Sequence, residues 1–193
     1  MIIDNIDKEM GEKTYISTRE LINLGISKAS ISRLVSKGDL IRVERGLYCR
    51  QDIIHDIMFI LHHKYKQGVF SHESALYIHG LTDRNPTFHV MSVPRNYRVT
   101  KSKKYNIEFK YVDKSMLNLG LKMYLSNMGN MIPVYDIERT ICDIIKSDTK
   151  MDSYEVNSAI RKYASKKKFS KLMLYAKKLG IERKVRKKLE VLL

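Results

Sequence analysis

The chain has 193 residues and a formal net charge of +15, and 44% of its residues are hydrophobic, which allows one large domain or two small ones. The sequence shows neither a signal peptide or acylation signal nor a long apolar run, which disfavours a membrane role. The excess of Lys and Arg instead indicates a polyanionic partner such as nucleic acid. The two cysteines, Cys49 and Cys142, lie far apart in apolar surroundings, which predicts free thiols and a reducing, cytoplasmic setting.

Residues 1–13 are polar and acidic, and we expect a loose or weakly helical lead-in there. Residues 14–50 then carry, in order, the local signals of a winged helix-turn-helix. Ser17 and Glu20 have the spacing of a capping box, which predicts a first helix over residues 18–24. Three apolar side chains of this helix are expected to face a core: Leu21, Ile22 and Leu24.

Gly25 is expected to end the first helix in a left-handed conformation, and Ser27 to cap a second helix from Lys28 to Lys37 that ends at Gly38. The side of the second helix that faces away from its apolar stripe is polar and basic. Its residues that we assign to DNA binding are Lys28, Ser30, Ser32, Arg33 and Lys37. Hydroxyl, Lys and Arg side chains suit a major groove, so this segment is predicted to be a recognition helix.

Two alternating segments, residues 40–43 and 47–50, flank the tight turn Glu44-Arg45-Gly46 and predict a hairpin. Arg42 and the tip residue Arg45 are placed to contact the DNA backbone or a minor groove. Helix-turn-helix units also serve as protein docking modules, and a basic face is often only solvated. The complete order of caps, turn and hairpin favours DNA contact over these alternatives.

Beyond the hairpin, the pattern passes from helix to strand and back to helix. A helical segment at residues 52–65 is followed by a second one that Ser71 caps and Gly80 ends. Strand-like segments lie at residues 87–93, 106–112, 121–125 and 132–135. Helical segments then follow at residues 136–146, 153–167, 170–179 and 182–192.

We therefore predict an α+β fold, with an N-terminal winged helix-turn-helix followed by a mixed α/β domain that ends in a basic helical bundle. The first domain would occupy residues 1–52 and the second residues 53–193. Within the second domain, strands would lie in residues 85–135 and the basic helices in residues 136–193.

The last 44 residues hold +10 of the net charge of +15. Their basic side chains fall largely outside the apolar stripes of two predicted helices. They are Arg161, Lys162, Lys166, Lys167, Lys168, Arg183, Lys184, Arg186, Lys187 and Lys188. A merely solvated face is the alternative, but two such faces with little compensating acid favour a second polyanion-binding surface. Its partner is left open between DNA, RNA and a protein.

Enzymatic alternatives depend on few residues. Glu108 and Lys110 have the E-x-K spacing of a metal-dependent nuclease, but the upstream acid would have to be Glu73 or Asp83, neither of which has the usual strand context. The histidines lack the closer, mixed ligands that Zn²⁺ prefers, and the sequence has no Walker loop or G-x-S-x-G elbow. We therefore predict a protein that is not an enzyme and has no metal or cofactor, with a DNA nuclease as the alternative.

Three further motifs carry a resemblance: SHESALYIHGL at residues 71–81, TFHVMSVP at 87–94 and VYDIERTICD at 134–143. Together with the winged helix-turn-helix, they resemble the AbiEi family, the antitoxins of type IV abortive-infection toxin–antitoxin systems of bacteria. The resemblance implies that the N-terminal domain represses its own operon. It also implies that the C-terminal domain opposes a nucleotidyltransferase toxin, for which a stable complex is not required. By its spacing, Arg139 could pair with Asp143 or reach across to another element, which favours a structural network over a recognition surface for this motif.

The sequence features predict a cytoplasmic protein that binds double-stranded DNA, and the resemblance implies a phage-defence antitoxin that represses its own promoter, which we expect to contain inverted repeats. A general nucleic-acid-binding protein remains the second alternative. No heptad zipper is present, so the sequence leaves a monomer and a dimer equally open.

Overall fold

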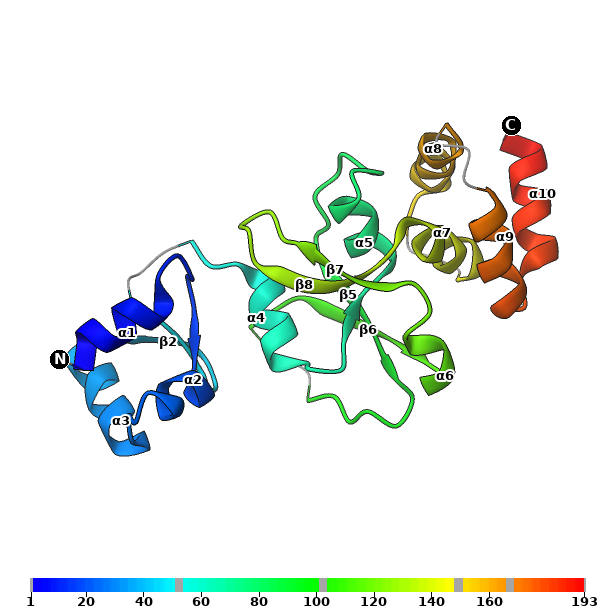
Figure 1. Ribbon diagram of the computed structural model, residues 1–193. Coiled ribbons are helices and arrows are strands. Elements are labelled where there is room, and N and C mark those ends of the chain that lie inside the picture. Colours follow the sequence, from blue (N-terminus) through cyan, green and yellow to red (C-terminus); the bar gives the residue numbers. More distant parts are fainter. Residues whose placement is uncertain (1, 51–53, 101–103, 148–150, 166–168, 193) are drawn as a thin grey trace. The chain divides into compact units, whose positions relative to one another are not determined.

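A computed structural model describes residues 2–50, 54–100, 104–147, 151–165 and 169–192 (Figure 1). The chain divides into two compact units, Met1–Lys64 and Tyr65–Leu193, which are described separately below. The sequence predicted a domain boundary at residue 52, whereas the first unit extends to Lys64 because the helix that ends there is tied to residues of the preceding sheet.

The first unit combines helices with a small antiparallel sheet. Its helices are α1 (Ile2–Met10), α2 (Thr18–Asn23), α3 (Lys28–Lys37) and α4 (Ile57–Lys64). Its strands are β1 (Ile16–Ser17), β2 (Ile41–Glu44) and β3 (Leu47–Cys49), in the order β1-β3-β2. The helix-turn-helix order and the hairpin predicted for residues 14–50 are therefore present in this unit.

The core of this unit draws on the N-terminal segment. Ile6 and Met10 of α1 are buried with Leu21, Ile31 and other apolar residues. The lead-in is therefore a regular helix, because apolar residues four positions apart form a stripe that the core can cover. One prediction is wrong at α2, where Ile22 is 45% exposed. A six-residue helix buries one narrow face, which Leu21 occupies.

Helix α4 begins later than the predicted residue 52, because Asp56 caps it by accepting a hydrogen bond from the Phe59 amide at 3.0 Å. The Phe59 ring stacks on Tyr15 with centroids 5.2 Å apart, and the Tyr15 hydroxyl accepts the Asp56 amide at 2.8 Å. At the other end of α4, Lys64 pairs with Glu44 of β2 at 3.0 Å. These contacts make α4 part of the first unit.

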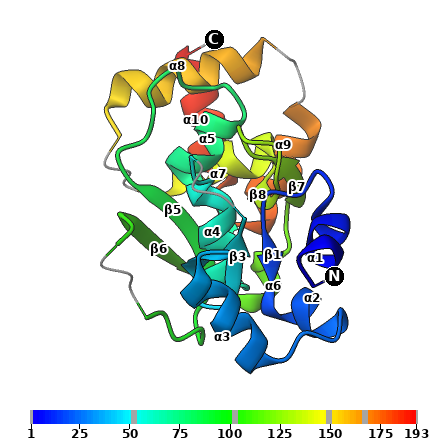
Figure 2. The ribbon, with the colours of Figure 1, turned by 90° about the vertical axis from the view of Figure 1, so that its left-hand side faces the viewer.

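The second unit contains a five-stranded mixed sheet, of which β5, β6, β7 and β8 are labelled in Figure 2. Its strands are β4 (Val69–Phe70), β5 (His89–Pro94), β6 (Ile107–Val112), β7 (Leu121–Leu125) and β8 (Met131–Tyr135). Their order is β6-β5-β4-β8-β7, with β5 parallel to β6 and β4 parallel to β8. Helices α5 (His72–Ile78) and α6 (Lys114–Leu117) lie between strands in the chain. The sequence did not predict β4 or α6, because segments of two and four residues are too short to show a periodic pattern of apolar side chains.

The C-terminal helices pack into one core beyond the sheet (Figure 1). They are α7 (Ile137–Lys146), α8 (Ser153–Ala164), α9 (Phe169–Lys178) and α10 (Glu182–Leu192). Their buried residues include Ile141, Ile160, Tyr163, Leu172 and Val185. The predicted helical bundle is confirmed, except that α8 ends at Ala164, before the predicted residue 167.

Candidate nucleic-acid interface

The joint between α2 and α3 is formed by caps that the sequence predicted. The Ser17 hydroxyl accepts the Glu20 amide at 3.3 Å, while the Glu20 carboxylate accepts the Ser17 amide at 2.7 Å. After α2, Gly25 has φ 80° and donates to the carbonyl of Ile22 at 2.9 Å, and Ile26 donates to the carbonyl of Leu21 at 3.1 Å. This pair of bonds is a Schellman motif, which fixes the direction in which α3 leaves.

Helix α3 starts at Ser27, whose hydroxyl accepts the Ser30 amide at 3.1 Å, and ends at the left-handed Gly38. Four of the five predicted recognition residues are exposed on it: Lys28, Ser32, Arg33 and Lys37. Ser30 is only half-exposed, and its hydroxyl lies 3.0 Å from that of Ser27. Ser30 therefore belongs to the cap rather than to the open face.

The hairpin after α3 presents both predicted arginines. Arg42 and Arg45 are exposed, and Arg45 lies in the turn between β2 and β3 beside the left-handed Gly46. The register shifts between Arg42 and Glu44, which marks a bulge before the turn. The Gly46 carbonyl accepts the Thr18 amide at 2.9 Å, so the tip of the hairpin is anchored to the start of α2.

The arginines of α3 and of the hairpin are not neutralised by the acids of the first unit that the structure describes. Ion pairs within the first unit use Lys13, Arg50 and Lys64, with acids of α1, α2 and β2. Among the residues that the structure describes, no carboxylate pairs with Arg33, Arg42 or Arg45. Cations without a protein partner are the groups that neutralise phosphates and release counterions.

A second basic surface lies on α9 and α10. Arg183, Lys184, Arg186 and Lys187 are exposed on α10, and Lys188 is half-buried. Part of this charge is compensated, because Arg186 pairs with Glu182 at 2.8 Å. The sequence-based prediction missed Lys177 and Lys178 of α9, which are exposed, and Lys177 lines the same shallow hollow as Arg183 and Arg186.

The predicted basic residues of α8 do not all join that surface. Arg161 is exposed, but Lys162 is half-buried and pairs with Asp83 at 3.0 Å. Lys166, Lys167 and Lys168 lie outside the described residues.

The VYDIERTICD motif forms a buried network. Arg139 is 1% exposed, and its Nε donates to Asp143 at 2.9 Å. Its Nη1 donates to the carbonyls of Met116 and Leu119 at 2.7 and 2.9 Å, and its guanidinium lies 4.1 Å from the ring centroid of Tyr135. Burial raises the pKa of Asp143, and Arg139 opposes that shift. Arg139 thus joins α6, α7 and β8.

Lys171 makes a second link, between α9 and the start of α7. Lys171 Nζ lies 2.8 Å from Asp136 and 2.9 Å from Glu138, and the Tyr175 hydroxyl donates to Asp136 at 3.2 Å. Although burial lowers the pKa of Lys171, the hydrogen bonds to both carboxylates raise it above its ordinary value overall. These acids therefore hold the bundle together, and the motif is structural in its buried part.

The region around His72 is buried and strained. His72 has φ 49°, a conformation that residues other than glycine rarely adopt. Burial, together with the charges of Lys110 and Arg139, lowers the pKa of His72 to about 3. Ser71 precedes α5 as predicted, but its hydroxyl does not cap the helix. It instead lies 3.0 Å from His72 Nδ1 and accepts the Ser92 hydroxyl at 2.9 Å.

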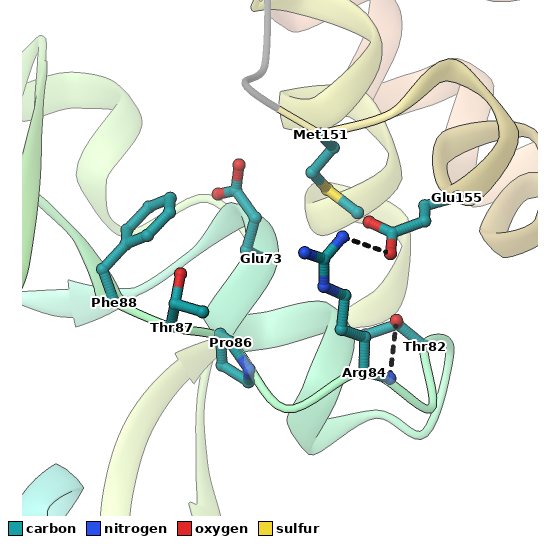
Figure 3. Close-up of a pocket in the computed structure, with 8 residues that line it drawn as sticks. All are labelled: Glu73, Thr82, Arg84, Pro86, Thr87, Phe88, Met151 and Glu155. Atoms are coloured by element: carbon teal, nitrogen blue, oxygen red, sulfur yellow. Dashed lines mark hydrogen bonds and ion pairs between the residues drawn. The ribbon is translucent and has the colours of Figure 1, made fainter.

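The residues of the nuclease hypothesis are dispersed. Glu108 pairs with Lys110 at 2.9 Å, and Asp83 is paired with Lys162. Glu73 instead lines a hollow of about 170 Å³, which the Arg84–Glu155 ion pair bridges at 3.1 Å (Figure 3). In the described part of the chain, no three His, Cys, Asp or Glu side chains are grouped as metal ligands.

Cys49 and Cys142 are both buried and unbridged. Burial raises the pKa of Cys142 to about 12, with a further contribution from Asp143. None of the helices that the structure describes is both long and apolar enough to span a bilayer.

The first unit thus has a helix-turn-helix-like region with an uncompensated basic face, within a mixed α/β chain. Residues 10–51 match the model of the family described as "Transcriptional regulator, AbiEi antitoxin", the family that the motif resemblance named. At the level of this family, the match supports a DNA-binding antitoxin. The matched segment lies within the first unit.

The fold is also similar to the crystal structure of the RV2827C protein from Mycobacterium tuberculosis. The TM-score is 0.64 at 12% sequence identity, over 91% of this chain and 71% of that one. At this identity the likeness concerns the fold alone. A comparison with curated proteins finds no match.

Proposed function

We propose that this chain is a DNA-binding autorepressor and the antitoxin of a type IV toxin–antitoxin pair that protects bacteria from phage. The observation that carries the proposal is the exposure of four polar or basic side chains on α3, together with that of two arginines of the hairpin in the same unit. The match of residues 10–51 to a family of transcriptional regulators supports the same role.

In this proposal the first unit is a winged helix-turn-helix. Helix α3 enters a major groove, where Lys28, Ser32, Arg33 and Lys37 reach base edges and phosphates. Arg42 and Arg45 form the wing and lie along the backbone or in a minor groove. The partner is double-stranded DNA at inverted repeats in the promoter of its own operon, in the cytoplasm.

The second unit supplies the antitoxin activity against a nucleotidyltransferase toxin, through a mechanism that need not involve a stable complex. The basic surface of α9 and α10 would bind a further polyanion. If that polyanion is the same DNA, bending it across both units enlarges the contacted surface at a deformation cost of a few kcal/mol.

A binding titration on the DNA upstream of its own gene tests the repressor role. Arg33→Ala and Arg45→Ala are expected to weaken binding, whereas Lys13→Ala, which removes a cation already paired with Glu9 and Glu20, is expected to leave it unchanged. Wild-type affinity for both arginine variants would contradict the assignment of this face to DNA.

A further inference from the structure

Exposed apolar side chains gather on one strand and turn of the second unit. Leu121, Met123 and Leu125 of β7 and Met128 and Met131 of the following turn and strand are between 36% and 61% exposed. Leu121, Met123 and Leu125 alternate along the strand, so they share one face of the sheet. Tyr124 points to the other face, where its ring meets His79 edge-on at 4.9 Å. Contiguous apolar surface of this kind marks interaction sites.

Strand β7 is also an open edge of the sheet. It pairs with β8 on one side, and among the described residues no strand pairs with it on the other. Two backbone hydrogen bonds join the ends of β7 to the β8 side. Before the strand, the Asp136 amide donates to the Gly120 carbonyl at 2.7 Å, and after it the Ser126 amide donates to the Asn130 carbonyl at 2.8 Å.

Gly120 and Ser126, at the two ends of β7, thus bond towards β8. Because hydrogen-bonded and non-hydrogen-bonded pairs alternate along an antiparallel ladder, the other residues of even number, Lys122 and Tyr124, also bond towards β8. The main-chain groups of Leu121, Met123 and Leu125 therefore face the open edge. The Leu121 amide bonds to the Asn118 carbonyl at 3.2 Å. The remaining amides and carbonyls offer a further strand the same alternating pattern that β8 uses.

The distribution of charge around β7 favours a second copy of this chain as the partner of this edge. Two copies of a chain with a net charge of +15 repel each other, yet Lys122 is the only charged residue in positions 115–135. The opposite edge strand, β6, carries the charged pair Glu108–Lys110, which protects an edge from strand addition. The repulsion between two copies of this chain is therefore weak at β7 itself, where Lys122 is the one nearby charge of positions 115–135.

We propose that β7 pairs with β7 of a second copy of this chain in an antiparallel arrangement centred on Met123. In this register Met123 lies opposite its own copy, and Leu121 lies opposite Leu125, so the apolar side chains of both copies meet on one face. Lys122 lies opposite Tyr124 and not opposite the other Lys122. A two-fold axis through Met123 joins the two sheets into one of ten strands.

A contact of one strand and a few apolar side chains is smaller than the roughly 1,600 Å² of a standard stable interface, so the dimer is weak and concentration-dependent. It does not depend on DNA. A two-fold dimer would nevertheless present two recognition units to an inverted repeat, and DNA that holds both units would strengthen the pairing.

Sedimentation of the full chain without DNA, over the micromolar range, tests the proposal. Met123→Glu puts two carboxylates opposite each other at the centre and is expected to weaken dimerisation by at least about tenfold. The matched control is Tyr111→Glu on β6, a residue that is 52% exposed, which is expected to leave the dimer unchanged. A wild-type chain that stays monomeric, or a dimer indifferent to Met123→Glu, would overturn it.

Cross-linking tests the register. Directly opposite residues in a bonded antiparallel pair have Cα atoms about 5.5 Å apart, within disulfide range, so Met123→Cys is expected to give a covalent dimer on mild oxidation. Tyr111→Cys is the control on β6, and the native Cys49 and Cys142 are buried. Equal cross-linking of both variants, or none at position 123, would overturn the register and with it the proposed dimer.

Discussion

Replacing Arg139 by Met is predicted to destabilise the second unit strongly. The substitution keeps much of the side-chain volume but removes the ion pair to Asp143 and the donor to the carbonyls of Met116 and Leu119. Because Asp143 is 5% exposed, its carboxylate would remain in the interior without its cation. Breaking a buried pair from one side costs about 3–5 kcal/mol, which corresponds to a fall in Tm of roughly 10–20 °C.

Thermal and urea unfolding followed by circular dichroism measure this loss. The control is Arg186→Met, which breaks another i, i+4 pair, with Glu182, on the surface and is expected to cost about 0.5 kcal/mol or less. Adding Asp143→Leu to Arg139→Met should recover part of the stability, since no unpaired charge then stays buried. A loss below about 1 kcal/mol for Arg139→Met would refute the account of the network.

Four further outcomes follow from the geometry. Arg33→Ala and Arg45→Ala should each weaken DNA binding by about 1–3 kcal/mol in a titration while the Tm stays within a degree or two, since both side chains are exposed. When five cations of α10 are neutralised, the dependence of log K on log salt should flatten by about 0.9 for each phosphate that the protein no longer neutralises, and an unchanged slope would mean a solvated face. The five cations to be neutralised are Arg183, Lys184, Arg186, Lys187 and Lys188. Gly120→Ala should cost roughly 1–3 kcal/mol in urea unfolding, because Gly120 has φ 79° and a Cβ there would lie 2.6 Å from that of Arg139; a neutral effect would contradict this packing. Finally, the unfolded chain protonates His72 near pH 6.5 and the folded chain only near pH 3, so this group's contribution to stability is complete above pH 6.5 and falls by about 2 kcal/mol at pH 5. His72→Asn, which tolerates the left-handed φ, should remove that loss, and an unchanged pH profile would count against it.

Local signals predicted the first unit well. The caps at Ser17 and Ser27 and the left-handed Gly25 and Gly38 act within a few residues, so the limits of α2 and α3 could be read from the sequence. Burial was harder to predict, because it depends on what a helix packs against. Ile22 looked like a core residue but is exposed on a helix with one buried face.

The contacts of the second unit were less accessible to sequence reasoning. The spacing of Arg139 and Asp143 predicted their ion pair, yet nothing local indicated the carbonyls of Met116 and Leu119 as further acceptors. Those contacts exist only because α6 and α7 meet in the fold. For the same reason, the basic surface includes Lys177 from α9, while Lys162 is drawn into a pair with Asp83.

Nuclease protection on the DNA immediately upstream of the chain's own gene tests the central claim most directly. The winged helix-turn-helix account predicts a protected, repeated site at moderate salt, with protection lost in the Arg33→Ala and Arg45→Ala double variant. Diffuse coating that disappears with a modest rise in salt, and that the double variant reproduces, would contradict it. Binding would then come from the basic helices α9 and α10 alone.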